Sequence, residues 1–146
     1  MFNQQGFTLV ELMVVIAIIA MLSAIGLPGY QRYLDKAAMT DMLQMLAPYK
    51  SAVELCALQR GEVRECQAGQ DGIPEGMASR YVDRVTVQDG VISLTGRQAL
   101  KGLTLALTPK RHGDGLRWGS DCRAMENARH LLGPCQALFH MDGAEE

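Results

Sequence analysis

The chain has 146 residues, of which 48% are hydrophobic, 21% charged and 5% aromatic, and its 14 basic and 16 acidic side chains give a formal charge of −2. This length fits one domain of ordinary size and excludes a multidomain enzyme. The hydrophobic content excludes a disordered chain, and the near balance of charges excludes a strongly basic nucleic-acid-binding protein.

The N-terminal part of the chain is almost free of charge. The first 30 residues hold one formally charged side chain, Glu11, whereas the other 116 residues hold the remaining 29. Residues 7–27 read FTLVELMVVIAIIAMLSAIGL, in which the only polar types are Thr8, Glu11 and Ser23. A helix of this length spans ~31 Å, the thickness of the hydrocarbon core of a bilayer. The segment is therefore able to cross a membrane.

Two ordinary explanations account for this segment incompletely. A cleaved secretory signal needs a basic start and a small-x-small site after the apolar core, but residues 1–6 contain no Lys or Arg and residues 23–26 match such a site poorly. A plain membrane anchor leaves Glu11 unexplained, because a carboxylate near the bilayer centre costs ~2.5 kcal/mol or more. No Lys or Arg lies within 20 residues of Glu11. A cut between Gly6 and Phe7 would create an α-amino group and so supply the missing positive charge.

Residues 6–12, Gly-Phe-Thr-Leu-Val-Glu-Leu, resemble the processing motif of type IV prepilins. The resemblance implies that a membrane peptidase removes residues 1–6 as a leader after Gly6 and methylates the new N-terminal Phe7. It also implies that Glu11 pairs with the N-terminal amine of a neighbouring subunit during assembly. The leader lacks the Lys or Arg that this family commonly has, so the positive-inside rule gives little information on orientation.

The similarity to this family continues beyond the motif. The stretch GLPGYQRYLDKAAMTDMLQMLAPYKSAVELCAL at residues 26–58 is similar to enterobacterial pilins. Shorter similar pieces follow at residues 72–74 (GIP) and 93–96 (SLTG). The similarity is close over roughly the first 60 residues and patchier afterwards, which is typical of a variable surface domain.

An apolar stripe with steps of three or four residues follows the membrane-length segment. Its members are Tyr30, Leu34, Ala38, Met42, Met45, Tyr49, Val53 and Cys56. Such a stripe indicates an amphipathic helix packed on a soluble core, which is favoured over a Met-lined ligand groove. A helix from about residue 7 to about residue 60 would be ~80 Å long. Helix breaks, as kinks or local melting, are expected at Gly26, Pro28, Gly29 and Pro48, and the resemblance implies that the segment around Pro28 unwinds in the filament.

Short β-type runs make up the middle of the chain. Residues 81–88 and 91–95 flank Asp89-Gly90, a dipeptide typical of a two-residue hairpin turn. Leucines alternate with polar or small residues over 103–108, which predicts a third strand, and a shorter fourth strand is expected around Trp118. The apolar face of such a sheet packs most simply on the helix stripe. The expected fold is therefore α+β, with a long N-terminal helix packed on a small antiparallel sheet.

The four cysteines are Cys56, Cys66, Cys122 and Cys135. They form no CxxC motif, so zinc binding and thioredoxin-like chemistry have little support. Export to an oxidising compartment favours disulfides, and four cysteines allow three pairings. The sequential pairing resembles the cysteine placement of enterobacterial pilins and closes two short loops, each worth ~3 kcal/mol. The second pair would staple a C-terminal loop that resembles the exposed region that varies between pilins, and an adhesive role for this loop is a hypothesis.

The remaining polar residues indicate no active site. His112, His130 and His140 lack metal-ligand spacing and are expected on the surface, and the sequence contains no GxSxG elbow or Walker loop. No catalytic residue, metal site or cofactor is expected. Residues 110–112 (Lys-Arg-His) and Arg117 beside Trp118 form a pattern that could contact single-stranded DNA through charge and stacking. A solvated loop is the more common explanation, since the charge balance gives DNA binding no help.

These features together predict the major subunit of a type IV pilus. It would have a leader at residues 1–6, a hydrophobic transmembrane and filament-core segment at 7–29, and a periplasmic, later extracellular, domain at 30–146. The expected partners are identical subunits, the prepilin peptidase, the inner-membrane assembly machinery and, before assembly, the lipid bilayer. The filament would serve adhesion, motility or DNA uptake. A type II secretion pseudopilin and a membrane-anchored periplasmic enzyme or sensor are the alternatives.

Overall fold

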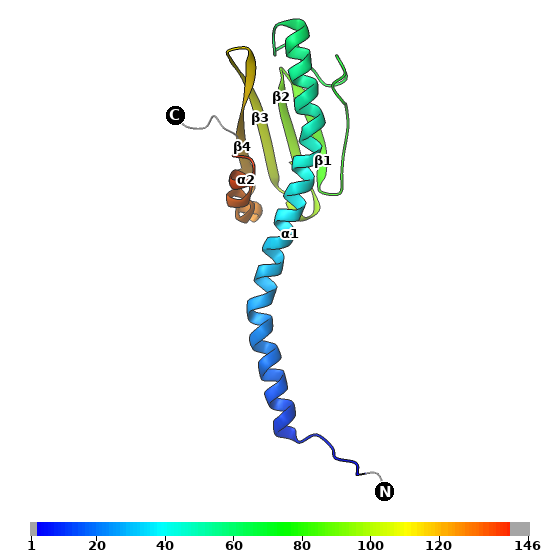
Figure 1. The fold of residues 1–146 in the computed structure, drawn as a ribbon, viewed down its shortest axis with the longest axis vertical. Helices are drawn as coiled ribbons and strands as arrows, with labels where there is room; N and C mark the ends of the chain where they lie inside the picture. The colour runs from blue at the N-terminus through cyan, green and yellow to red at the C-terminus, as the bar shows by residue number, and fades with distance from the viewer. Residues whose placement is uncertain (1–2, 141–146) are drawn as a thin grey trace. The chain divides into compact units, whose positions relative to one another are not determined.

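The computed structural model describes residues 3–140, so the first two residues of the expected leader and the last six of the chain lie outside the described part. The chain forms two compact units, one that extends to Leu34 and one that starts at Asp35. The elements in chain order are α1 (Leu9–Arg60), β1 (Val82–Gln88), β2 (Val91–Gly96), β3 (Leu103–His112), β4 (Gly115–Ala124) and α2 (Leu132–Leu138) (Figure 1). The expected α+β class, with a long N-terminal helix and an antiparallel sheet, is confirmed.

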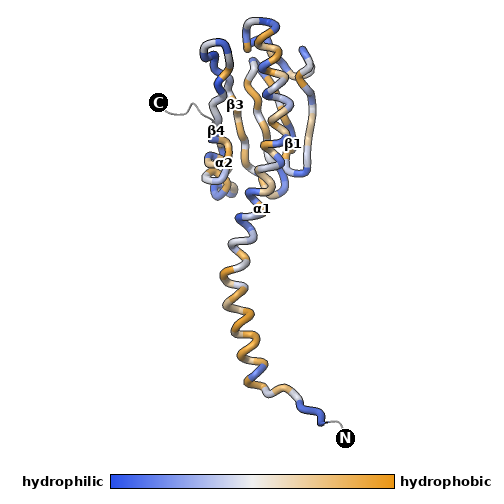
Figure 2. Tube along the Cα trace, in the orientation of Figure 1, coloured by the Kyte–Doolittle hydropathy of each residue, from blue (hydrophilic) through white to orange (hydrophobic). Residues whose placement is uncertain are grey.

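The first half of α1 is apolar in composition but is not covered by other parts of the described chain. Every residue from position 9 to position 34 is exposed, although most of them are apolar. Figure 2 shows this stretch as an almost continuous hydrophobic band. Within the described residues α1 is the one helix long and apolar enough to cross a membrane. A helix that is apolar on all sides needs lipid or other apolar helices around it.

Helix breaks, as kinks or local melting, were expected at Gly26, Pro28, Gly29 and Pro48, and α1 is assigned as helix through all four positions. The expected kinks and the unwinding in the filament stay predictions. A proline inside a helix removes one amide donor and costs about 3 kcal/mol. The hydrogen bonds of the turns on either side remain, however, and α1 is 52 residues long.

The four strands form an antiparallel sheet in the order β1-β2-β3-β4. Gln88 pairs with Val91, so Asp89 and Gly90 form a two-residue turn, and their φ angles of +52° and +76° are those that the predicted hairpin requires. β3 and β4 are each ten residues long and pair from Leu103↔Ala124 to His112↔Gly115. The fourth strand is therefore longer than expected.

The core lies between α1 and one face of the sheet. The apolar stripe is buried at Ala38, Met42, Tyr49, Val53 and Cys56, as expected, and the cluster also contains Ile92, Leu94 and Leu105 from the sheet. Met45 is only partly buried, and Met39 and Leu46 are buried in addition. Tyr30 and Leu34 are exposed because they belong to the first unit, which has no sheet to cover them. Of the two methionines in the stripe, Met42 therefore lies in the core and Met45 packs at its edge.

Two disulfides join Cys56 to Cys66 and Cys122 to Cys135. The first connects the last turns of α1 to the loop that follows it. The second connects β4 to α2 and encloses a 3₁₀ helix, Glu126–Leu131. This is the sequential pairing that was expected. One disulfide fixes the loop after α1 to that helix, and the other fixes the C-terminal segment to β4.

Candidate functional site

The residues that precede α1 are open to solvent. Gly6 and Phe7 lie directly before the helix, and the side chain of Phe7 is 90% exposed. A Cβ atom placed on Gly6 would meet no atom within 4 Å. The Gly6–Phe7 peptide bond is therefore accessible to another protein.

The carboxylate of Glu11 lies one turn further on and closes the start of the helix. The backbone N–H of Thr8 donates to Glu11 Oε2 at 2.9 Å, and the Thr8 hydroxyl donates to the same oxygen at 3.0 Å. The backbone N–H of Glu11 in turn donates to the Thr8 hydroxyl oxygen at 3.3 Å. This is a capping box, in which an N-cap Thr and a Glu three residues later satisfy each other's backbone donors. Within the described residues, Glu11 Oε1 accepts no hydrogen bond.

Sequence reasoning looked for a cation beside Glu11 and missed Thr8. The spacing Thr-x-x-Glu before an apolar run is itself the signature of a capping box and could have identified Thr8. The two donors offset part of the cost of placing a carboxylate in an apolar segment, and the partial positive charge of the helix N-terminus acts in the same direction. One carboxylate oxygen is held in place, and the other is able to accept a donor from another chain.

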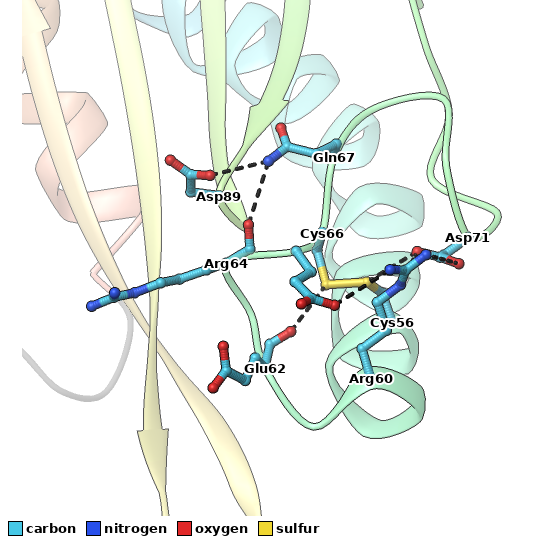
Figure 3. The surroundings of a disulfide bond; sticks show 9 residues. Cys56, Arg60, Glu62, Arg64, Cys66, Gln67, Asp71 and Asp89 are labelled. Atoms are coloured by element: carbon cyan, nitrogen blue, oxygen red, sulfur yellow. Dashed lines mark hydrogen bonds and ion pairs between the residues drawn. A yellow bond between two sulfur atoms is a disulfide. The ribbon is translucent and has the colours of Figure 1, made fainter.

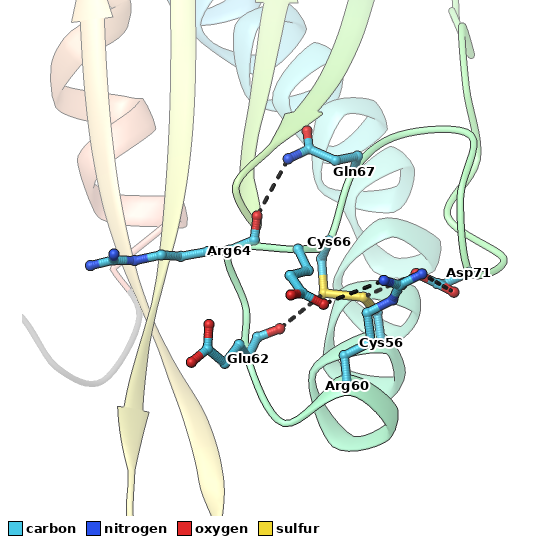
Figure 4. Close-up of polar contacts among 8 residues, drawn as sticks. Cys56, Arg60, Glu62, Arg64, Cys66, Gln67 and Asp71 are labelled. Carbon is cyan, nitrogen blue, oxygen red and sulfur yellow. Dashed lines mark hydrogen bonds and ion pairs between the residues drawn. A yellow bond between two sulfur atoms is a disulfide. The ribbon is translucent and has the colours of Figure 1, made fainter.

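The loop after α1 carries a second polar cluster, around the first disulfide (Figures 3 and 4). Arg60 donates two hydrogen bonds to the carboxylate of Asp71, at 2.7 and 3.2 Å, and a third to Glu65 at 3.3 Å. The bond to Asp71 is the main cause that raises the pKa of Arg60. The amide group of Gln67 donates to Asp89 at 3.0 Å, and the carbonyl of Cys66 accepts a bond from Gly90 at 3.0 Å. These bonds fix the loop to the β1–β2 turn and indicate a structural role.

The basic residues near Trp118 do not form the arrangement that stacking on DNA bases requires. The Trp118 ring is only 5% exposed, its Nε1 donates to Glu54 at 2.8 Å, and the Lys50 ammonium lies 5.6 Å from the ring centre. Trp118 is therefore not exposed for stacking on bases, which the less favoured DNA-binding interpretation of this pattern required. Lys110, Arg111, His112 and Arg117 are exposed, as are His130 and His140. Among residues 3–140, no group of three or more His, Cys, Asp or Glu side chains is placed to hold a metal ion.

Comparison with known proteins agrees with the fold and with the N-terminal site. Residues 1–27 match the family model of the prokaryotic N-terminal methylation motif, and residues 36–129 match that of the bacterial filament protein pilin. Prepilin peptidase-dependent protein D of Escherichia coli K12 is 49% identical over 97% of this chain and 98% of its own length. Type IV major pilin protein PilE1 of Neisseria gonorrhoeae is 35% identical over 79% of this chain and 74% of its own length.

A solved structure shares the architecture. The solution NMR structure of the major type IV pilin PpdD from enterohemorrhagic Escherichia coli aligns with a TM-score of 0.66 and 41% identity over 77% of this chain and 86% of PpdD. The chain therefore belongs to the type IV pilin family. Proteins of this family are structural subunits that polymerise into filaments from a membrane-anchored precursor, and the N-terminal methylation motif is the place where that precursor is processed.

Proposed function

We propose that the chain is the major subunit of a type IV pilus. In this proposal residues 7–29 hold the precursor in the inner membrane, the prepilin peptidase cuts after Gly6 and methylates Phe7, and the assembly machinery polymerises the product into a helical surface filament. The observation that carries the proposal is the carboxylate of Glu11, which has one oxygen without a donor among residues 3–140 and lies just after an accessible Gly6–Phe7 bond.

The chemistry of assembly follows from this arrangement. Cleavage after Gly6 creates a positively charged amine on Phe7, four residues before Glu11. In the filament, the apolar surface of the helix leaves lipid and packs against neighbouring helices. The apolar area that is shielded from water therefore changes little. The amine of one subunit then meets the carboxylate of another in an apolar surrounding, where a charge pair is stable only with good geometry. The pair thereby sets the register between subunits.

The segment at Gly26, Pro28 and Gly29 has a place in the same proposal. It is helical here, but one amide donor is missing and two residues lack a Cβ, so α1 is weakest at this point. Packing in the filament would unwind it at low cost. Adhesion, twitching motility and DNA uptake would be properties of the assembled filament.

The two alternatives make different predictions. A type II secretion pseudopilin has the same N-terminal chemistry, and recovery of a surface filament separates it from a pilin. The names of the relatives favour the pilus, since PpdD and PilE1 are each described as a major type IV pilin. A membrane-anchored enzyme or sensor would retain its first residue and act without assembly.

Substitution of Glu11 tests the proposed role directly. Breaking a buried ion pair costs about 3–5 kcal/mol, so Glu11→Ala should lower the yield of sheared surface filaments at least about tenfold. Insertion into membranes should be unchanged, because the substitution removes a charge from the apolar segment. Ser23→Ala is the matched control, since the Ser23 hydroxyl donates to the Ile19 carbonyl of its own helix and, within the described chain, to nothing else. A normal filament yield from Glu11→Ala would contradict the proposal.

A further inference from the structure

One end of the sheet, at which α1 enters the second unit, is rich in basic side chains. β1 and β3 begin there and β2 and β4 finish there, so the connections at residues 79–81, 97–102 and 125–131 surround this end, opposite the β3–β4 turn (Figure 1). Asp41 of α1 accepts a hydrogen bond from the Ser79 hydroxyl, which places the entry of the helix at the same end. Glu126 is the one acid in these connections. Four side chains in them are basic, and we call these the basic end: Arg80, Arg97, Lys101 and Arg129.

Hydrogen bonds between the connections join the basic end into one surface. The backbone N–H of Arg97 donates to the Tyr81 carbonyl at 2.8 Å, and Arg97 Nε donates to the Arg80 carbonyl at 3.2 Å. The backbone N–H of Met125 donates to the Gly102 carbonyl at 2.9 Å. The middle connection is therefore bonded to both of the others, and the four cations belong to one rigid face.

The cations of the basic end are exposed and have no countercharge within the described chain. All four are open to solvent. Every ion pair among residues 3–140 involves Arg60 or Arg123, so the basic end takes part in none. Met125 lies among these side chains and is 68% exposed, which adds an apolar contact to the charged surface. Such a surface suits a partner that offers many negative charges beside an apolar layer.

The length of the chain before the second unit limits how far the basic end can lie from a membrane that holds residues 7–29. The apolar run ends at Leu27, and the second unit starts at Asp35. The stretch between them is helical and so spans about 12 Å. It contains Tyr30 and Tyr33, which are exposed, and exposed tyrosines are typical of the membrane–water interface. The headgroup layer is roughly 5–8 Å thick on each side of a bilayer, so the entry of α1 lies close to it.

We propose that the basic end docks the domain on anionic phospholipid headgroups of the membrane that holds the precursor. This inference rests on the proposed insertion of residues 7–29. Each Lys or Arg close to an anionic lipid surface strengthens the contact about fivefold, and the four cations of the basic end act together. Docking holds the domain in one orientation until the subunit leaves the lipid, and assembly into a filament must break these contacts.

The test uses the full chain in lipid nanodiscs that carry a gadolinium chelate on some headgroups. One kind of nanodisc contains neutral phosphatidylcholine alone, and the other also contains anionic phosphatidylglycerol. Paramagnetic enhancement of amide relaxation, measured by NMR, reports which amides lie close to the headgroups. The enhancement at Gly102 and Asn127 should be strong in the anionic nanodiscs and weaker in the neutral ones, and high salt should remove the difference. The amides of Gly90 and Gly113, in the turns at the opposite end of the sheet, should show little enhancement in either.

Two matched variants locate the contact. K101Q/R129Q removes two of the four cations, which should weaken docking about 25-fold, so the enhancement at Gly102 and Asn127 should fall to its value in neutral nanodiscs. The control K110Q/R117Q makes the same change of net charge at an exposed register pair near the β3–β4 turn, and it should keep the native enhancement.

Three results would overturn the docking while leaving the proposed function intact. They are equal enhancement in neutral and anionic nanodiscs, native enhancement in K101Q/R129Q, and an equal loss in both variants, which would mean that net charge and not the basic end governs the contact. Failure of the proposed insertion has a separate signature, because the amide hydrogens of residues 12–25 would then exchange rapidly with solvent in both kinds of nanodisc. That result would overturn the insertion and the docking together.

Discussion

The carboxylate of Glu11 is a charged group in an otherwise apolar segment, and its immediate surroundings make that position tolerable. Thr8 provides two donors to one oxygen and receives one bond in return. The sequence alone indicated that Glu11 needs a partner. It predicted a positively charged partner, because an isolated carboxylate in lipid is usually compensated by a cation; the neutral donors of Thr8 were not predicted. The capping box is a local pattern, so this part of the site was within reach of sequence reasoning.

Substitutions of Thr8 test the capping box. Thr8→Val keeps the shape of the side chain but removes both bonds of the hydroxyl group, and loss of an N-cap costs about 1 kcal/mol. The backbone amide of Glu11 should then exchange its hydrogen about fivefold faster in detergent micelles, as measured by NMR. Thr8→Ser keeps the hydroxyl and should behave as the native chain. Unchanged exchange in the valine variant would mean that the hydroxyl does not hold the start of α1.

Substitutions at two glycines with positive φ, one in a crowded position and one in an open position, distinguish the cost of backbone strain from the cost of a steric clash. A Cβ on Gly90 (φ +76°) would overlap Val63 Cγ1 and lie 2.9 Å from the Val63 carbonyl oxygen, whereas Gly113 (φ +59°) has open space around it. Gly113→Ala should cost only about 1 kcal/mol, and Gly90→Ala at least about 2 kcal/mol more. Urea unfolding followed by fluorescence of the single tryptophan measures both. Equal losses of stability would contradict the packing of the loop on the β1–β2 turn.

At the scale of elements, the features that could be predicted are those that local sequence determines. The Asp89-Gly90 turn, the leucine alternation of β3 and the long apolar run before residue 30 each specify their own structure. The end of β3 could not be predicted, because Pro109 normally ends a strand. Beyond Leu107, β3 pairs with β4 but not with β2. Pro109 has no N–H to donate, and it is tolerated here because one edge of β3 has no partner strand that would need this donor.

Contacts between distant elements set the remaining limits. Trp118 is buried, and its Nε1 donates to Glu54, 64 residues earlier in the chain; no local sequence pattern predicts such a contact. The choice of Leu46 over Met45 for the core depends on how α1 lies on the sheet, and both residues fit a helical apolar period. For the same reason the sequence could not show that Trp118 is buried and so not exposed for base stacking.

The disulfides connect elements, so their removal should lower the stability of the domain that begins at Asp35. Each closes a short loop, with sequence separations of 10 and 13 residues. The chain-entropy account gives about 3 kcal/mol for each. We expect this loss for Cys56→Ser with Cys66→Ser, and a similar loss for Cys122→Ser with Cys135→Ser, in urea unfolding followed by Trp118 fluorescence. If both double variants unfolded at the native urea concentration, the disulfides would not stabilise the domain.

At the scale of the whole molecule, the sequence is divided between two environments. One formally charged side chain lies in the first 30 residues and 29 lie in the rest, and the described structure places an exposed apolar helix in one unit and a disulfide-bonded core in the other. Lipid and a bundle of like helices are the two surroundings that suit such a helix. A precursor in the membrane and a subunit in a filament are therefore two states of one chain with the same apolar surface covered.

The most direct measurement is mass spectrometry of the intact chain and of its N-terminal peptide, on material from membranes and on filaments sheared from the same cells. The account predicts that the chain in the sheared fraction starts at methylated Phe7. Such a result would establish processing after Gly6 and export in a filament together. A chain that still starts at Met1 and occurs only in membranes, in cells with an active prepilin peptidase, would contradict the account and favour a membrane-anchored domain.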